Sequence, residues 1–299
     1  MASGTKASLA LEEAYGYCQA LTRKRARNFY FAFLSLPAEQ RRAIYVAYAF
    51  CRGCDDYSDD DIELDRKVEL LEDYRRQLRE CFQGNPSGPV FTALAEVVGR
   101  YQIPEEYFED IISGVQMDLT INRYETFDDL YEYCYKVASV VGLMCIEIFG
   151  YSDARAKQSA VDLGIGMQLV NIMRDVKEDA ERDRIYLPLQ DLGQFGYTEA
   201  DLLGGVVNQP FVELMQHEAG RARDYFRRGG EMMPLLSTRS RPCPAILRGL
   251  YSTLLKRIEA NDFNVFQQRI RLSTPHKLWL AGRIWTTTLL KSAAPGASW

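Results

Sequence analysis

The stretch NIMRDVKED, residues 171–179, carries side chains that could bind a metal ion. Asn171, Asp175 and Asp179 follow one another at intervals of four residues, with Arg174 beside them. Helix formers surround them, and residues four apart share one face of an α-helix. Oxygen ligands without His or Cys suit Mg²⁺, which carboxylates commonly hold together with substrate phosphates. The stretch is therefore either a solvated acidic surface or half of a metal-diphosphate site.

A second stripe has the same character. Tyr45, Tyr48, Arg52, Asp55 and Asp59 follow one another at spacings of 3, 4, 3 and 4. On a helix the two aspartates lie one turn apart, about 6 Å along the axis. Two carboxylates at this spacing repel each other unless they are screened by solvent or hold cations. This stripe could supply the opposing wall of the same site.

Both stripes continue into apolar, aromatic or small residues on the same face, unlike a purely solvated surface. Gly164 and Gln168 extend the stripe of residues 171–179 towards the N-terminus, and the glycine leaves room beside the helix. Two such helices facing each other would form a cavity that is acidic at one end and apolar further in. Such a cavity suits a diphosphate head with a long hydrocarbon tail.

Two further segments could line this cavity. In the stretch 133–150, Ala138 and Gly142 are one turn apart, which permits close approach by another helix or by a ligand tail. The stretch NFYFAF adds aromatic rings, and aromatic faces stabilise cations at close range. Core packing would explain both segments equally well. The rings are Phe29, Tyr30 and Phe33.

The elements that must position these residues are helices. Apolar residues recur at spacings of three and four in several segments, whereas period-two runs are scarce. We therefore expect an all-α fold in which residues 1–299 form one large helical bundle with a central cavity, with residues 1–19 and 292–299 at its periphery. The expected helices are 38–54, 63–82, 105–121, 127–149, 153–179, 211–233, 244–260 and 275–291. The expected breaks are 83–89, 203–210 and 237–244.

Composition restricts the classes of function. The 36 basic and 41 acidic residues give a net charge of −5, which argues against the basic footprint of a nucleic-acid-binding protein. Seven scattered cysteines indicate reduced thiols in a cytosolic compartment, and the pair Cys51 and Cys54 fits a buried helix face better than a zinc or redox site. No apolar run is long enough for a signal peptide or a membrane span. We expect a cytoplasmic protein, possibly in peripheral contact with membranes.

These motifs resemble those of the squalene/phytoene synthases, which join two prenyl diphosphates head to head. The stretches YCYKVASVVGLMCIEI (133–148) and LGIGMQLVNIMRDVKEDAERDRIYLP (163–188) resemble the two family signatures. AFCRGCDDYSDD resembles the first aspartate-rich motif, NFYFAFLSLP the N-terminal substrate helix, and residues 250–280 the C-terminal portion. The resemblance runs from about residue 20 to 290. It implies an all-α bundle of the isoprenoid synthase type.

The resemblance also implies roles for individual residues. Asp55, Asp59, Asn171, Asp175 and Asp179 would hold Mg²⁺, with Mn²⁺ as a possible substitute. Contacts to phosphate oxygens would come from Arg52, Arg174, Tyr251 and one of Arg269 and Arg271. The prenyl chains would lie against Phe29, Tyr30, Phe33, Val137, Ala138, Gly142 and Gln168. Tyr133 is a candidate proton acceptor, as is the released diphosphate.

The resemblance leaves the product open. We expect farnesyl diphosphate to be condensed through presqualene diphosphate to squalene, with phytoene formation from geranylgeranyl diphosphate, or dehydrosqualene formation, as the alternatives. Squalene formation requires hydride from NADPH. The stretch LGIGMQL lacks the third glycine of a nicotinamide-binding fingerprint and lies in an expected helix, but an α-helical bundle would bind NADPH in another way, so NADPH use stays open. The sequence shows neither the C-terminal membrane anchor of eukaryotic squalene synthases nor the transit peptide of the plant enzymes. In this respect we expect it to resemble the bacterial or archaeal members. The expected partners are prenyl diphosphates, and the oligomeric state is undetermined.

Two other classes of function remain at this point. A terpene cyclase or a head-to-tail prenyl elongase would share the DDYSD motif and the 4, 4 spacing of residues 171–179. The RIYLP segment (184–188) and the YCYKVAS segment point away from both. The other class is a family member retained as a non-catalytic scaffold, and the intact candidate metal ligands argue against it.

Overall fold

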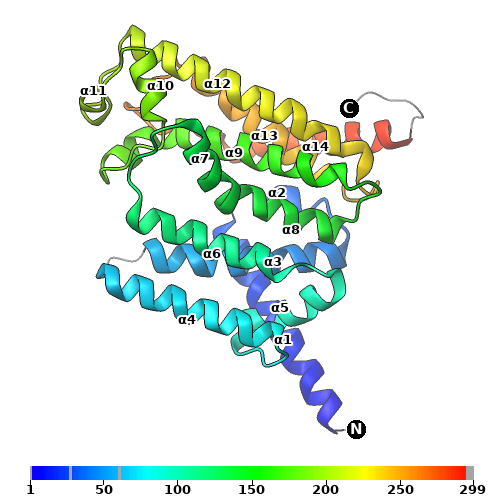
Figure 1. The fold of residues 1–299 in the computed structure, drawn as a ribbon. Coiled ribbons are helices and arrows are strands. Elements are labelled where there is room, and N and C mark those ends of the chain that lie inside the picture. The colour runs from blue at the N-terminus through cyan, green and yellow to red at the C-terminus, as the bar shows by residue number, and fades with distance from the viewer. Residues whose placement is uncertain (1, 27–28, 60–61, 294–299) are drawn as a thin grey trace.

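The computed structural model describes residues 2–26, 29–59 and 62–293. Its helices form a single bundle, drawn in Figure 1. No strand forms within these residues, where the β-type contacts are isolated bridges between Arg123 and Ile185 and between Tyr151 and Leu236. The helices are α1 (Ala2–Arg25), α2 (Tyr30–Phe33), α3 (Ala38–Asp59), α4 (Leu64–Phe82), α5 (Gly88–Tyr101), α6 (Glu105–Thr120), α7 (Phe127–Cys134), η1 (Tyr135–Ser139), α8 (Val140–Phe149), α9 (Arg155–Ala180), α10 (Leu189–Gln194), α11 (Glu199–Leu203), α12 (Gln209–Gly229), η2 (Gly230–Leu235), α13 (Pro242–Glu259) and α14 (Thr274–Ala293).

Local capping fixes several helix ends. Thr126 and Asp129 form a reciprocal capping box at the start of α7, where the sequence places a start signal. The Asn208 side chain accepts a hydrogen bond from the Phe211 amide and caps α12, so this helix begins within the break expected at 203–210. Such caps satisfy backbone amides that have no partner within the helix. At these two helices the capping residues and the helical periodicity therefore indicate nearly the same starting point.

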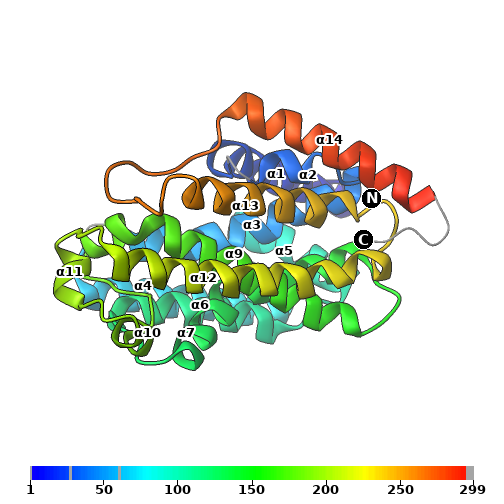
Figure 2. The same cartoon turned by 90° about the horizontal axis from the view of Figure 1, so that it is seen from above.

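Helix α9 lies at the centre of the bundle. It packs against α12, α8, α13 and the segments η1 and η2. More than half of its residues are buried, including Ile165 and Val170. Seen from above in Figure 2, α12, α13 and α14 form successive layers, and α14 is outermost. The aspartates of α9 are thus held by the most constrained helix in the fold.

The segment between α7 and α8 is one turn of π-helix, η1, and it coincides with the YKVAS stretch of the family signature. A Cβ atom added at Gly164 of α9 would lie 2.5 Å from the Cα atom of Ser139. The Ser139 hydroxyl donates to the Val161 carbonyl at 2.8 Å. The two signature segments therefore pack directly against each other. Gly164 was expected to leave room beside α9, and the backbone of η1 occupies that room.

Several features differ from the expectations. Helix α5 was not expected from the sequence. Its apolar residues, among them Phe91 and Leu94, are buried against several helices, so the segment lacks a clear division into one apolar and one polar face. Residues 1–19 are not wholly peripheral, since Ala14 and Cys18 are buried within the core. Residues 294–299 lie outside the described part of the chain. None of the described helices is long and apolar enough to span a bilayer.

Candidate active site

Asp175 of α9 forms ion pairs with arginines from two parts of the chain. The Arg174 Nε donates to Asp175 at 2.7 Å, and the Arg269 guanidinium reaches the same carboxylate at 2.9 Å. Arg269 also pairs with Glu178 at 2.7 Å. Arg269 lies in the extended segment between α13 and α14, so the C-terminal part of the chain closes over the end of the α9 stripe.

The acidic end of α3 is arranged differently. The Arg52 Nε donates to Asp56 at 2.8 Å, and Arg25 approaches that carboxylate at 3.8 Å. Asp56 lies outside the predicted stripe. Asp55, which belongs to it, lies 3.8 Å from Arg52 and is half exposed. The side chain of Asp59 lies outside the described side chains.

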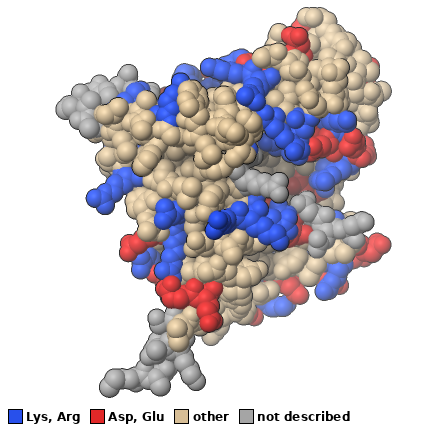
Figure 3. Space-filling model, turned by 180° about the vertical axis from the view of Figure 1, so that it is seen from behind, with Lys and Arg blue, Asp and Glu red and all other residues tan. Residues whose placement is uncertain are grey.

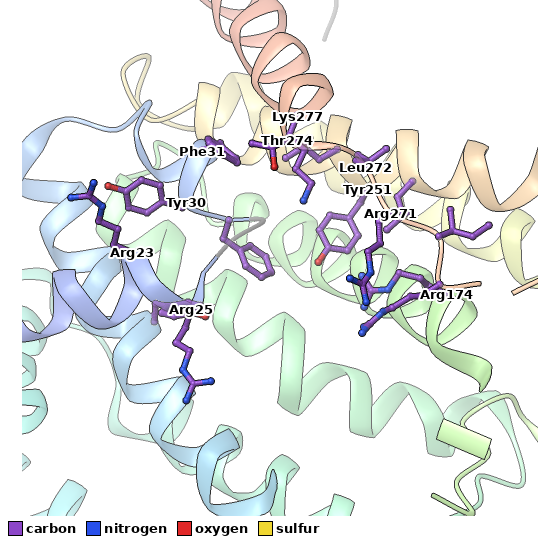
Figure 4. Close-up of a pocket in the computed structure, with 16 residues that line it drawn as sticks. Arg23, Arg25, Tyr30, Phe31, Arg174, Tyr251, Arg271, Leu272, Thr274 and Lys277 are labelled. Carbon is purple, nitrogen blue, oxygen red and sulfur yellow. The ribbon is translucent and has the colours of Figure 1, made fainter. Parts of the chain in front are cut away.

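A cavity of about 700 Å³ lies beside the α9 stripe. Figure 4 shows Arg174, Arg271 and Tyr251 on one side of it and Arg23 and Arg25 on the other. Within the described residues its lining contains no carboxylate, and it includes Arg174 and Arg269, which pair with Asp175. The expected acidic end is therefore basic at the cavity surface. The remaining lining residues are Phe29, Tyr30, Phe31, Tyr48, Leu250, Leu254, Arg269, Ile270, Leu272, Thr274 and Lys277.

The cations of this cavity are crowded together. Burial, followed by the positive charges of Arg174 and Arg271, lowers the pKa of Lys277. Cations held close together in a partly buried setting are stabilised by an anion placed between them. Figure 3 shows the same feature from outside, as a hollow bordered by blue Lys and Arg side chains. The cavity is thus suited to an anionic group such as diphosphate.

Tyr251 links the cavity to the α9 stripe. It is buried in α13, and its hydroxyl interacts with Asn171, while Arg174 lies nearby. Burial raises the pKa of Tyr251, so the phenol stays protonated and can donate a hydrogen bond. The Asn171 amide in turn donates to Gln168 at 3.1 Å. The structure therefore brings together three residues that the sequence placed on two separate motifs.

The predicted aromatic residues cluster beside the cavity. Phe29 and Tyr30 line it, and the ring of Phe29 lies 6.3 Å from that of Tyr251. Phe33 is buried behind them, with its ring 6.2 Å from Phe29 and 6.4 Å from Tyr48. The arrangement provides a wall of rings adjoining the cationic group.

The small residues of η1 and α8 face helices. A Cβ atom at Gly142 would lie 3.0 Å from the Ala160 carbonyl oxygen of α9. Ala138 backs onto Gly164, and Val137 contacts Gly114 of α6. Close packing against α9 thus explains the small residue at position 142, and such packing was one of the two explanations that the sequence left open. Neither Val137 nor Ala138 borders the 700 Å³ cavity.

Tyr133 belongs to a buried hydrogen-bonded cluster. Its hydroxyl donates to Asp118 at 3.1 Å, and the Tyr186 hydroxyl donates to the other oxygen of that carboxylate at 2.7 Å. Burial and the Asp118 charge raise the pKa of Tyr133 well above its usual value. A phenol in this state donates a proton to its hydrogen bond and is a poor proton acceptor. The geometry gives Tyr133 a role in orienting Asp118.

Asp179 has the features of a metal ligand. Burial and the neighbouring Asp175 charge raise its pKa to about 7. Among the described residues its carboxylate has no hydrogen-bond or ion-pair partner, although Arg184 is near enough to oppose the shift. A largely buried carboxylate without a partner, beside a second carboxylate, is stabilised by a bound cation. The donor set of α9 therefore fits Mg²⁺.

Sequence reasoning missed several residues of this site. Asp118 lies in α6 outside both signatures, and only its contacts to Tyr133 and Tyr186 reveal it. Arg23 and Arg25 belong to the basic run TRKRAR before the aromatic stretch, which was an available signal. Lys277 lies two residues beyond the RIRLSTP segment, which ends at Pro275.

The fold places the protein among the all-α isoprenoid synthases. The structure aligns with a dehydrosqualene synthase at a TM-score of 0.86 and 31% identity, covering 93% of this chain and 97% of the other. It aligns with a squalene synthase from Alicyclobacillus acidocaldarius at 0.81 and 30% identity, covering 86% and 97%.

Sequence comparison defines the family. The squalene/phytoene synthase family model matches residues 22–276, and the chain belongs to this family of head-to-head prenyltransferases. A 15-cis-phytoene synthase of Synechococcus elongatus is 39% identical over 287 residues, 92% of this chain and 93% of the relative. Phytoene synthase 2 of Solanum lycopersicum is 37% identical over 275 residues, 90% and 88% of the two chains.

Proposed function

We propose that the protein is a phytoene synthase, which condenses two molecules of geranylgeranyl diphosphate head to head. The observation that carries the proposal is the cationic cavity, bordered by aromatic rings and adjoining the α9 aspartates. Curated relatives named phytoene synthase at 36–39% identity support the C20 substrate over the farnesyl diphosphate favoured by the sequence alone.

Binding would begin with the diphosphate heads. Arg174, Arg271 and Lys277 offer adjacent donors on one side of the cavity, and Arg25 offers another from across it. Guanidinium groups match phosphate oxygens in a bidentate geometry. The Asn171–Tyr251 contact would hold the Tyr251 hydroxyl towards the same region.

The donor set at the ends of α3 and α9 fits Mg²⁺, with Mn²⁺ as a possible substitute. Asp55, Asp59, Asn171, Asp175 and Asp179 would hold it. A bound divalent cation would neutralise diphosphate charge and make the diphosphate a better leaving group. The arginines would add to this effect, since Arg174 and Arg269 can turn from Asp175 towards a substrate phosphate.

The chemistry then proceeds in two stages. The C1–O bond of one substrate breaks, diphosphate departs, and the C2–C3 double bond of the second substrate attacks the allylic cation. Loss of a proton closes a cyclopropane and gives prephytoene diphosphate. A second ionisation, skeletal rearrangement and loss of another proton give phytoene and a second diphosphate, without a reductant. The aromatic wall of Phe29, Phe33 and Tyr48 would keep water from the cations.

The experiment is product identification by mass spectrometry with C15 and C20 diphosphates, each with and without Mg²⁺ and NADPH. We expect a C40 hydrocarbon from the C20 substrate, formed with Mg²⁺ and independently of NADPH. A C30 product from the C15 substrate alone would instead support dehydrosqualene or squalene synthesis, the activities named for the structural neighbours. A C15 or C20 hydrocarbon would identify a cyclase, and no turnover would indicate a scaffold.

A further inference from the structure

The outer side of α14 exposes an unusual amount of apolar surface. Five large side chains are 40–71% exposed there, and they include two of the three tryptophans in the sequence. We refer to the exposed surface formed by these five residues, together with Gly282 and Thr286, as the α14 face. The five are Leu278, Trp279, Trp285, Leu289 and Leu290.

These residues occupy the side of α14 that points away from the protein. The opposite side carries Leu280 and Ala281, which are buried, and Ile284, which packs against Gly249 of α13. Along the α14 face the hydroxyl of Thr286 donates to the helix carbonyls of Gly282 and Arg283. Hydroxyls satisfied by their own helix add little polarity to the surface.

The charge of α14 is of one sign. Residues 274–293 contain no Asp or Glu. Arg283 stacks over the ring of Trp279, with its guanidinium carbon 4.8 Å from the ring centre, and Lys291 lies in the last turn. A helix with Trp and Leu on its outer face and with basic residues is the pattern of an interfacial helix on an anionic lipid surface.

The α14 face adjoins the cavity. The first turn of α14 supplies Thr274 and Lys277 to the cavity lining. Viewed from behind in Figure 3, an area of tan surface in the upper half lies on the same side of the molecule as the hollow bordered by Lys and Arg. Leu34, which follows the α14-contacting helix α2, is also 46% exposed.

We propose that the α14 face docks on the surface of an anionic lipid bilayer, with the mouth of the cavity turned towards the lipid. The polyprenyl substrates and the hydrocarbon of the proposed function partition into lipid, so a docked cavity exchanges them without exposing the chains to water. A second copy of the chain fits less well. The outer face of a 20-residue helix, about 30 Å by 10 Å, offers about 300 Å², below the ~800 Å² per partner of stable interfaces.

Intrinsic fluorescence provides a direct test. All three tryptophans, Trp279, Trp285 and Trp299, lie in the last 21 residues, so their emission reports on the C-terminal region alone. The variant Trp299→Phe restricts the signal to α14. The protein, without substrate, is titrated with vesicles of phosphatidylcholine alone and with vesicles that also contain phosphatidylglycerol. We expect an emission shift to shorter wavelength and co-sedimentation, both stronger with the anionic vesicles.

A matched pair of variants distinguishes vesicle binding through the α14 face from non-specific hydrophobic binding by other exposed residues. The double variant Trp279→Ser/Leu290→Ser removes two side chains of the α14 face, and we expect at least a tenfold weaker vesicle partition, about 1.4 kcal/mol. The double variant Leu64→Ser/Val68→Ser removes two exposed apolar residues of α4 and should bind like the parent. Binding of the double variants is read by co-sedimentation.

The outcomes are distinguishable. Absence of binding by the parent protein, or equal loss of binding in both double variants, overturns the proposal. A concentration-dependent dimer in sedimentation velocity, with its tryptophans shielded in the absence of lipid, assigns the face to a second copy. Turnover of detergent-dispersed substrate is expected to be equal in the α14 and α4 variants. Because vesicle binding is measured without substrate, its failure leaves the proposed function untouched.

Discussion

Helices α3 and α9 carry aspartates at the same four-residue spacing but in different surroundings. In α9, Asp175 is only 17% exposed and is held by Arg174 from its own helix and Arg269 from the C-terminal segment. In α3, Asp55 is 51% exposed, and Arg52 pairs mainly with its neighbour Asp56. Identical spacing therefore does not imply identical environments, because α9 runs through the centre of the bundle whereas α3 ends at its surface.

The contrast predicts a division of labour. Asp175 of α9 is already positioned by packing and ion pairs, whereas the more exposed side chain of Asp55 can adjust when a cation and a substrate arrive. Substitutions in α9 should accordingly affect the chemical step most, and substitutions in α3 should affect the concentration of Mg²⁺ that is required. The experiments below test this division.

The largest effect is expected for Asp175→Asn. It removes charge at the point where Arg174 and Arg269 meet, and we expect kcat to fall by at least about 10³-fold, roughly 4 kcal/mol. The measurement is diphosphate release at saturating Mg²⁺. Glu178→Gln is the matched control, because Glu178 pairs with the same Arg269 but lies outside the stripe. Its activity should fall less than about tenfold, and similar losses in both variants would contradict a special role for Asp175.

The next effect separates Asp55 from Asp56. Asp55→Asn should raise the Mg²⁺ concentration for half-maximal activity by about 10²-fold if the exposed carboxylate binds the cation. Asp56→Asn loosens Arg52 and Arg25 and should raise KM by about tenfold or less. Initial rates measured over a series of Mg²⁺ and substrate concentrations distinguish the two changes. The reverse order would identify Asp56 as the α3 ligand.

Much of this contrast could be predicted from the sequence. The helical spacing identified both stripes, and the resemblance linked Tyr251 and one of Arg269 and Arg271 to them. The sequence could not give the pairing of Arg269 with Asp175, because these residues are 94 positions apart and the intervening chain must fold first. The basic lining of the cavity also depends on the tertiary fold, since Arg25, Arg174 and Arg271 come from distant parts of the chain.

Local rules were also insufficient at η1. Helical periodicity predicted a continuous helix over 127–149, and the structure inserts one π-helical turn. This turn packs its backbone on α9, a tertiary contact that single-sequence periodicity does not contain. The small residues that suggested a ligand tunnel, such as Gly142, are explained there by helix contact.

A stability comparison tests how rigidly each helix is held. Gly164→Ala in α9 places a Cβ atom 2.5 Å from backbone of η1, whereas Gly53→Ala in α3 meets the end of the Tyr74 side chain. Backbone cannot move aside as readily, so we expect Gly164→Ala to cost about 2 kcal/mol and Gly53→Ala about 1 kcal/mol in urea unfolding. Gly220→Ala, with open space around its Cα atom, should be neutral or slightly stabilising. Equal costs at positions 164 and 53 would contradict the contrast.

The last predicted effect, a pH dependence of stability, extends the comparison to a carboxylate away from the cavity. Glu218 of α12 is fully buried beside Asp191, His217 and Arg221, yet its Oε2 atom has no hydrogen-bond partner in the described part of the chain. Burial raises its pKa from 4.5 to about 7, despite the opposing charge of Arg221. The folded protein thus retains a proton that the unfolded chain releases between these pH values.

The sign follows from this difference. Because the folded state binds more protons between about pH 4.5 and 7, the contribution of Glu218 to the free energy of unfolding is greatest at the acidic end and declines as pH rises through 7. One proton gives a slope of at most about 1.4 kcal/mol per pH unit. Glu218→Gln should flatten the measured dependence of unfolding free energy on pH across this window, and the exposed Glu213→Gln on the same helix should not. An unchanged slope in Glu218→Gln would indicate that Arg221 keeps the buried Glu218 carboxylate ionised.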